Sequence, residues 1–148
     1  MRRVLGLDPG ERRIGVALSD PTGTIASPHS VIDRRTTSVA DAVRSICEEF
    51  AVELIVVGLP TGLSGNEGPA AQAAREVAKT VGETTGLPVE LQDERFTTVT
   101  AEAALLEGGV RRAKRKDVRD KVAAAVILQG YLDRKDVFSD EPDDEQRN

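Results

Sequence analysis

Residues 4–20 read VLGLDPGERRIGVALSD, two short apolar runs joined by a turn that contains proline and glycine. Apolar runs bounded by such residues are typical of a β-hairpin whose strands are buried in a sheet. Asp8 follows the first run, where the buried strand is expected to end. Burying a carboxylate is costly unless it is hydrogen-bonded, paired or bound to a cation. Asp8 therefore either begins an Asx-type turn with Pro9 and Gly10 or serves as a functional acid.

The composition is that of a soluble globular protein with one domain. The chain has 148 residues, of which 39% are hydrophobic and 30% are charged. Its single cysteine, Cys47, excludes an intrachain disulfide and favours the reducing cytoplasm. We expect neither a signal peptide nor a membrane span, because no long apolar segment follows the first residues.

The formal charge of −5 is concentrated at the C-terminal end of the chain. Residues 136–148 contain six acidic residues and one arginine, without apolar periodicity. Such a composition predicts an acidic, disordered tail. It leaves a folded domain over residues 1–135, in which basic and acidic residues balance.

The remaining apolar segments alternate between strand and helix patterns. After the hairpin, strands are expected over residues 24–32, 54–57 and 89–92, and helices over residues 39–50, 69–81, 99–107 and 117–132. Pro28 argues that the first of these strands lies at an edge or contains a kink. This order predicts an α/β domain, a mixed sheet flanked by helices.

Glu94 resembles Asp8 in following a predicted strand. It is also followed at once by a cation and two hydroxyl residues. The alternative to a functional role is a solvated acid at a strand end, or an ion pair with Arg95.

Asp120 begins an apolar stripe on the last predicted helix. Ala124, Ile127 and Tyr131 follow it at helical spacing, so the stripe and Asp120 are expected to face the sheet. The alternative is an acid in the first helical turn, where the helix dipole favours negative charge.

Three inward acids from three separate elements suit the binding of divalent metal ions. Hard ions such as Mg²⁺ or Mn²⁺ bind a few carboxylate oxygens and leave other positions for water and phosphate. Two such ions roughly 4 Å apart activate water and stabilise the leaving oxygen in phosphodiester cleavage. Without a cation the carboxylates would repel one another. We therefore predict that Asp8, Glu94 and Asp120 are the catalytic and metal-binding residues.

A run of cations lies directly before and around Asp120. Charge runs are usually solvated faces, but one that adjoins a candidate acid site favours a phosphate backbone as its partner. The predicted nucleic-acid contacts are Arg95, Arg111, Arg112, Lys114, Arg115 and Lys116.

Four groups of residues, in order along the chain, resemble the YqgF/RuvX family of Holliday-junction-resolvase-like proteins and pre-16S rRNA nucleases. They are LDPG (7–10) with IGVA (14–17), VVGLP (56–60), DERFTT (93–98), and DKVAA (120–124) with ILQGYL (127–132). The resemblance extends from about Val4 to Asp133 and leaves only the acidic tail outside.

The resemblance implies an RNase H-like fold, a five-stranded mixed sheet of three antiparallel strands followed by α/β crossovers. It implies that Asp8, Glu94 and Asp120 form an acidic triad that holds divalent metal. It also implies a part in processing the 5′ end of the small-subunit ribosomal RNA precursor. Many RNase H-like enzymes carry an acid at the end of the fourth strand, where this chain has Gly58-Leu59-Pro60, so Glu94 would substitute.

Other functions remain open at this point. Branched DNA is an alternative substrate to structured RNA, and a nucleic-acid-binding ribosome-assembly factor without catalysis is a different class. The LDPG segment also resembles the first phosphate loop of sugar kinases and actin-like ATPases, which need a second domain to close over ATP. The oligomeric state is left as monomer or homodimer.

Overall fold

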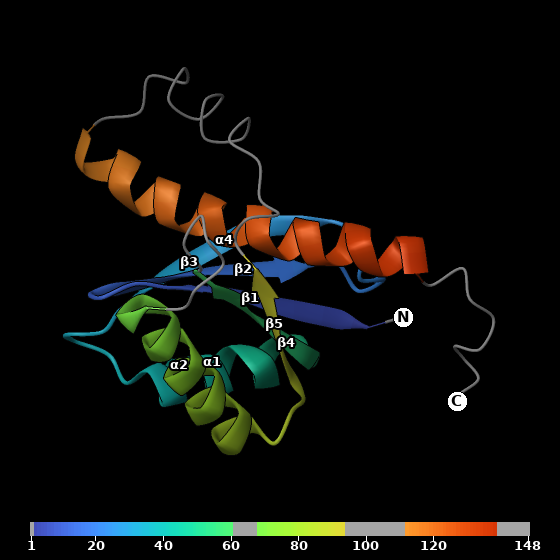
Figure 1. Cartoon of the computed structure of the whole chain (residues 1–148), viewed down its shortest axis with the longest axis horizontal. Helices are drawn as coiled ribbons and strands as arrows, with labels where there is room; N and C mark the ends of the chain where they lie inside the picture. Colours follow the sequence, from blue (N-terminus) through green and yellow to red (C-terminus); the bar gives the residue numbers. More distant parts are fainter. Residues whose placement is uncertain (1, 61–67, 94–111, 139–148) are drawn as a thin grey trace.

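The computed structural model describes residues 2–60, 68–93 and 112–138, without the side chains of 112–117 and 135–138. Its centre is one five-stranded sheet in the order β3-β2-β1-β4-β5 (Figure 1). The strands are β1 (Arg3–Pro9), β2 (Arg13–Ser19), β3 (Ala26–Asp33), β4 (Val52–Leu59) and β5 (Val89–Asp93). The first three pair antiparallel, and β4 and β5 run parallel to β1. The predicted α/β class and mixed five-stranded sheet are confirmed.

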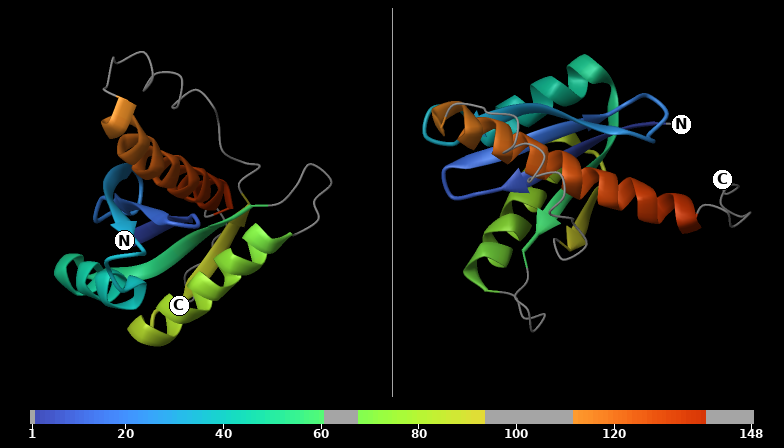
Figure 2. Two further views of the ribbon diagram at one scale, coloured as in Figure 1. Left: turned by 90° about the vertical axis from the view of Figure 1, so that its left-hand side faces the viewer. Right: turned by 90° about the horizontal axis from the view of Figure 1, so that it is seen from above.

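The described helices lie on both faces of this sheet. They are α1 (Val39–Phe50), α2 (Pro69–Thr85) and α4 (Arg112–Phe138). The side view shows α1 and α2 together on one face and α4 crossing the other (Figure 2). The sheet is therefore covered on both sides, which explains why its central strands read as continuous apolar runs.

Side-chain alternation along β1 divides the core into two parts. Leu5 and Leu7 pack in the cluster that contains the buried residues of α1 and α2. Val4 packs in the cluster formed with α4. Gly6 faces the same side as Val4, because a Cβ atom there would lie 2.7 Å from Cβ of Leu128. Every second position of β1 therefore faces α4.

Strand β3 is an edge strand, as Pro28 predicted. Its pairing with β2 shifts register between Val16 and Ala17, and Pro28 stands opposite Ala17. A proline has no N–H to donate to the ladder, so a shift at this residue is expected.

The last helix is longer than the predicted segment 117–132. It begins at Arg112 and ends at Phe138, so residues 136–138, expected to belong to the acidic tail, are helical. The apolar periodicity marks only the part of this helix that packs on the sheet, and its polar ends carry no such signal. The helix predicted over residues 99–107 and the remainder of the tail, residues 139–148, lie outside the described residues.

Candidate active site

Asp8 is the penultimate residue of β1 and pairs with Gly15 of β2. Since Val4 and Gly6 face α4, alternation places Asp8 on that same face. The residue is half-buried. The sequence therefore positions this acid at the end of a buried strand, directed to the side of the sheet that α4 covers.

Asp120 reaches this place because β2 has a glycine opposite Asp8. A Cβ atom on Gly15 would lie 2.0 Å from the carbonyl oxygen of Asp120, so only glycine allows α4 to approach so closely. The residue that pairs with Asp8 thus contacts the backbone of Asp120. The structure brings these two predicted site residues to one end of the sheet, on one face.

Arg13 supplies a counter-charge that sequence reasoning missed. Its Nε lies 3.1 Å from Oδ2 of Asp120, with the two side chains 27% and 32% exposed. A partly exposed pair of this kind contributes only about 0.2–1 kcal/mol to stability, but it offsets the repulsion expected between neighbouring acids. The signal was present in the sequence, because Arg13 precedes Gly15 by two residues in a strand and therefore shares its face.

Gln92 of β5 is a second polar residue at this end of the sheet. The pairing of Leu7 with Val57 puts Asp8 beside Gly58 at the next position, and Gly58 pairs with Gln92. A glycine therefore separates the acid from the amide, and no side chain fills the position between them.

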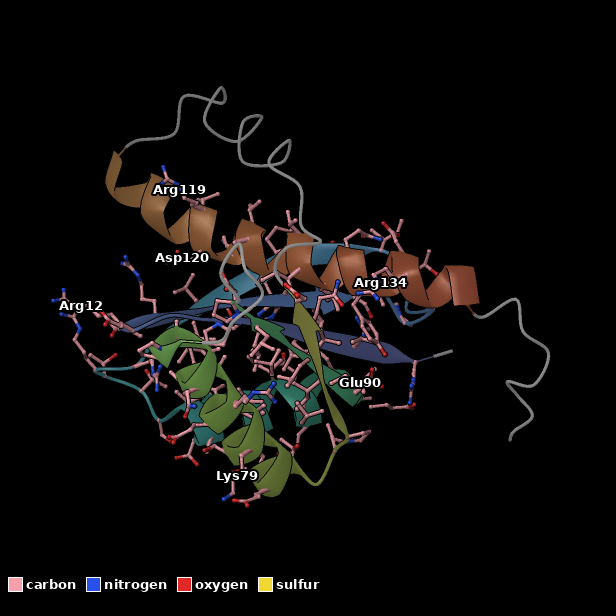
Figure 3. All side chains as sticks on the ribbon, viewed as in Figure 1. Arg12, Lys79, Glu90, Arg119, Asp120 and Arg134 are labelled. Atoms are coloured by element: carbon pink, nitrogen blue, oxygen red, sulfur yellow. The ribbon has the colours of Figure 1, made fainter. Side chains whose placement is uncertain are left out.

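The amide of Gln92 is buried and incompletely satisfied. The residue is 3% exposed, and its Nε2 has no hydrogen-bond partner among the described residues. Arg134 of α4 donates from Nη1 to Oε1 of Gln92 at 3.5 Å, which is at the limit of a hydrogen bond. Since Arg134 belongs to α4 (Figure 3), this contact puts Gln92 on the face of the sheet that α4 covers.

These residues fit a hard divalent cation. Asp8 and Asp120 offer carboxylate oxygens, which Mg²⁺ and Mn²⁺ prefer, and the guanidinium of Arg13 shows that one of them accepts a cation at short distance. Within residues 2–60, 68–93 and 112–138, no group of three or more His, Cys, Asp or Glu residues gathers. The third predicted acid, Glu94, follows the end of β5 and lies outside the described residues.

The structure describes the predicted nucleic-acid-binding residues only in part. Arg95 and Arg111 lie outside the described residues, as do the side chains of Arg112, Lys114, Arg115 and Lys116. The backbone of the last four belongs to the N-terminal part of α4, on the same helix as Asp120. Arg119, which follows this run, is exposed.

Sequence reasoning also missed cations in two turns. Arg12 lies between β1 and β2, and Arg34 and Arg35 lie between β3 and α1. The N–H of Arg34 donates to the carbonyl of Arg12 at 2.8 Å, and its Nη1 donates to the carbonyl of Gly10 at 2.8 Å. Only the folded hairpin shows that these two turns lie side by side at the end of the sheet that holds Asp8.

Residues 2–134 match the family model "RuvX: Holliday junction resolvase". The chain belongs to the RuvX family. A curated RuvX relative from Clostridium botulinum (strain Alaska E43 / Type E3), named "Putative pre-16S rRNA nuclease", is 49% identical over 134 residues, which are 89% of this chain and 97% of the relative. A relative of the same name from Syntrophomonas wolfei is 44% identical over 132 residues, covering 88% and 94%. The resemblance found in the sequence is thereby confirmed.

A solved structure supports the fold. "T. thermophilus RuvC in complex with Holliday junction substrate" aligns with a TM-score of 0.59 and 19% identity, covering 91% of this RuvX chain and 97% of that chain. At this identity the match concerns the fold alone. Among the described helices, none is both long and apolar enough to cross a membrane.

Proposed function

We propose that this RuvX protein is a metal-dependent endonuclease that hydrolyses phosphodiester bonds during 5′-end processing of pre-16S ribosomal RNA. This role belongs to ribosome biogenesis and places the protein in the cytoplasm. The names of its relatives support the reaction and the substrate. The observation that carries the proposal is the approach of Asp120 to the strand pair Asp8–Gly15, which no residue larger than glycine would permit.

The proposed metal ligands are Asp8, Asp120 and Glu94, with Mg²⁺ or Mn²⁺ as the cofactor. A bound ion of this kind lowers the pKa of a water molecule and stabilises charge on the phosphate. Other residues of the chain position the metal ligands and the substrate. Arg13 fixes the carboxylate of Asp120 at the surface of the sheet. Gln92 carries a buried amide N–H without a partner among the described residues, and its proposed role is to donate to a non-bridging phosphate oxygen of the substrate.

The basic residues that precede Asp120 in the sequence form the proposed binding surface for the substrate. Arg95, Arg111, Arg112, Lys114, Arg115 and Lys116 would contact backbone phosphates, which contribute much of the affinity of nucleic-acid-binding proteins. Their place in the sequence, immediately before Asp120 and after Glu94, supports this role.

The test is cleavage of a precursor 16S RNA transcript by the purified full chain, with Mn²⁺ or with EDTA. We expect products only with the ion, and an initial rate at least ~100-fold lower for Asp8→Asn, because a catalytic ion stabilises the transition state by several kcal/mol. Asp41→Asn is the matched control, since this exposed aspartate lies on α1, across the sheet. Equal cleavage by Asp8→Asn, or cleavage in EDTA, would contradict the proposal.

Branched DNA is the second candidate substrate. The matching family model carries the description "Holliday junction resolvase", and the RuvC structure with the same fold was solved with such a junction. A four-way DNA junction assayed beside the RNA transcript, under the same conditions, decides between them. Faster cleavage of the junction would reassign the substrate and leave the roles of Asp8 and Asp120 unchanged.

A further inference from the structure

Two neighbouring turns at the acid end of the sheet are joined by hydrogen bonds. Arg12 belongs to the turn between β1 and β2, and Arg34 and Arg35 belong to the turn between β3 and α1. The two hydrogen bonds from Arg34, to the carbonyls of Arg12 and Gly10, join the turns at 2.8 Å each. We call Arg12, Arg34 and Arg35 the turn arginines.

The turn arginines lie next to the candidate acid site. Arg12 directly precedes Arg13, whose guanidinium pairs with Asp120. On the other element, Arg119 directly precedes Asp120. Figure 3 shows Arg12 at the tip of the hairpin and Arg119 on α4, with Asp120 between them. Cations from two separate elements therefore stand on both sides of an acid.

The charge at these turns is positive after the local acids are taken into account. Arg12 and Arg119 make no ion pair with any residue in the described ranges and are exposed. Arg35 pairs with Asp33 at 3.4 Å, but the two side chains are 66% and 38% exposed, and exposed pairs exchange partners at little cost. Glu11, in the first turn, is the remaining acid of the described turns.

We propose that the turn arginines bind the sugar–phosphate backbone of a nucleic acid, on the side of the acid pair opposite the basic run of α4. This inference rests on the proposed nuclease function and adds a second contact surface to it. A phosphodiester that approaches two carboxylates is repelled unless cations flank them. Arginine is suited to the task because its planar guanidinium binds phosphate through two hydrogen bonds.

The hydrogen bonds that join the turns support the same conclusion. Arg34 uses its guanidinium to hold the turns together, which leaves Arg12 and Arg35 as the groups available to a ligand. Side chains presented from a fixed backbone lose less conformational entropy on binding than those on a flexible segment. A long polyanion that contacts both the turns and α4 would thus be held across the acids.

The test measures binding of a fluorescein-labelled double-stranded RNA in EDTA, so that cleavage does not interfere, over a series of salt concentrations. We expect Arg12→Ala/Arg35→Ala to weaken binding and to reduce the slope of log K against log salt by about 0.9 for each arginine removed. The control Arg44→Ala/Lys79→Ala removes two exposed cations from α1 and α2, on the other face, and should leave the slope unchanged. Lysine at both turn positions should retain the slope, which excludes misfolding as the cause of a loss.

An unchanged slope in Arg12→Ala/Arg35→Ala, with a wild type that binds, would overturn the turn-arginine surface. An equal loss in the control variant would overturn it as well, because the effect would then follow total charge. The nuclease proposal stands or falls separately, on the cleavage assay with Asp8→Asn. A slope reduced only in the turn variant supports the assignment.

Discussion

Two aspartates of the N-terminal hairpin, Asp8 and Asp20, follow apolar strand segments and have different surroundings. Asp20 accepts hydrogen bonds from the backbone N–H groups of Thr24 at 2.8 Å and Ile25 at 2.9 Å, and from the hydroxyl of Thr22. These bonds hold the pKa of Asp20 well below its usual value. Asp8 instead faces α4, beside the glycine that contacts Asp120.

The difference lies in where the partners come from. Asp20 finds its partners within its own turn, so it is the kind of turn residue that a strand-end aspartate commonly becomes. Asp8 lies on the face of the sheet that is covered by a helix from the other end of the chain. A strand-end acid is therefore better assigned by the element that covers it than by the turn that follows it.

The glycines near these two aspartates provide the largest expected contrast. Gly15→Ala places a methyl group against the backbone of Asp120, and Gly23→Ala, in the Asp20 turn, forces alanine into φ +72°. Overpacking of this kind costs about 1–3 kcal/mol, so both variants should melt at lower temperature. We expect Mn²⁺ to raise the melting temperature of the wild type, and only Gly15→Ala should also lose this rise.

Thermal melting with and without Mn²⁺ checks this pair of variants. A Gly23→Ala protein that loses the Mn²⁺ effect to the same extent would show that the effect reports general stability rather than the acid site. A Gly15→Ala protein that keeps it would place the metal away from Asp120.

Gln92→Leu, on the edge strand β5, tests the acid site that distinguishes Asp8 from Asp20. If the amide donates to the substrate, cleavage should fall about 10- to 100-fold, the equivalent of a hydrogen bond to a charged group. Stability should be unchanged or higher, because the variant removes a buried N–H without a partner among the described residues. Initial rates and melting temperatures measure the two effects, with the exposed Gln72→Leu on α2 as control. Full activity together with lost stability would make Gln92 a structural residue.

The Asp20 turn yields the smallest expected effect, a change of stability with pH. The pKa of Asp20 is lowered chiefly by the backbone N–H of Ile25, from an ordinary value of 3.8. Its contribution is therefore fully present above the unfolded pKa and is lost as the pH falls through the folded pKa. The gap in melting temperature between wild type and Asp20→Asn should shrink as the pH drops below about 3.8. A gap that stays constant in acid would contradict this assignment.

Much of the fold was predictable because its signals are local. The apolar runs of β1, β2 and β4, and the helical spacing of apolar residues in α1 and α2, each specify an element from its own residues. The inward position of Asp120 was predictable as well, from the stripe that ends near Tyr131. The extent of α4 was not, since the apolar stripe of its sequence does not continue through residues 112–116 or 133–136.

The parts of the site that escaped prediction join distant segments. The ion pair of Arg13 crosses from β2 to α4, and the hydrogen bond from Arg34 to Gly10 crosses between turns. Spacing along the chain gives the face of β2 on which Arg13 lies, but it gives neither its partner on α4 nor the contact between the turns. Gln92 is recognisable in the sequence only as a polar residue inside a short predicted strand. Its place near Asp8 becomes apparent only from the strand pairing, in which Gly58 lies between the two residues.

The contact between Gly15 and Asp120 joins an early and a late segment of the chain. The ribosome synthesises the hairpin first and α4 last. Asp8 is therefore present without Asp120 during most of the synthesis of the chain. A polypeptide interrupted before α4 lacks Asp120, and with it the second acid of the site. Under the proposed assignment, a nascent chain would therefore lack one metal ligand, and with it the nuclease activity, until its synthesis is almost complete.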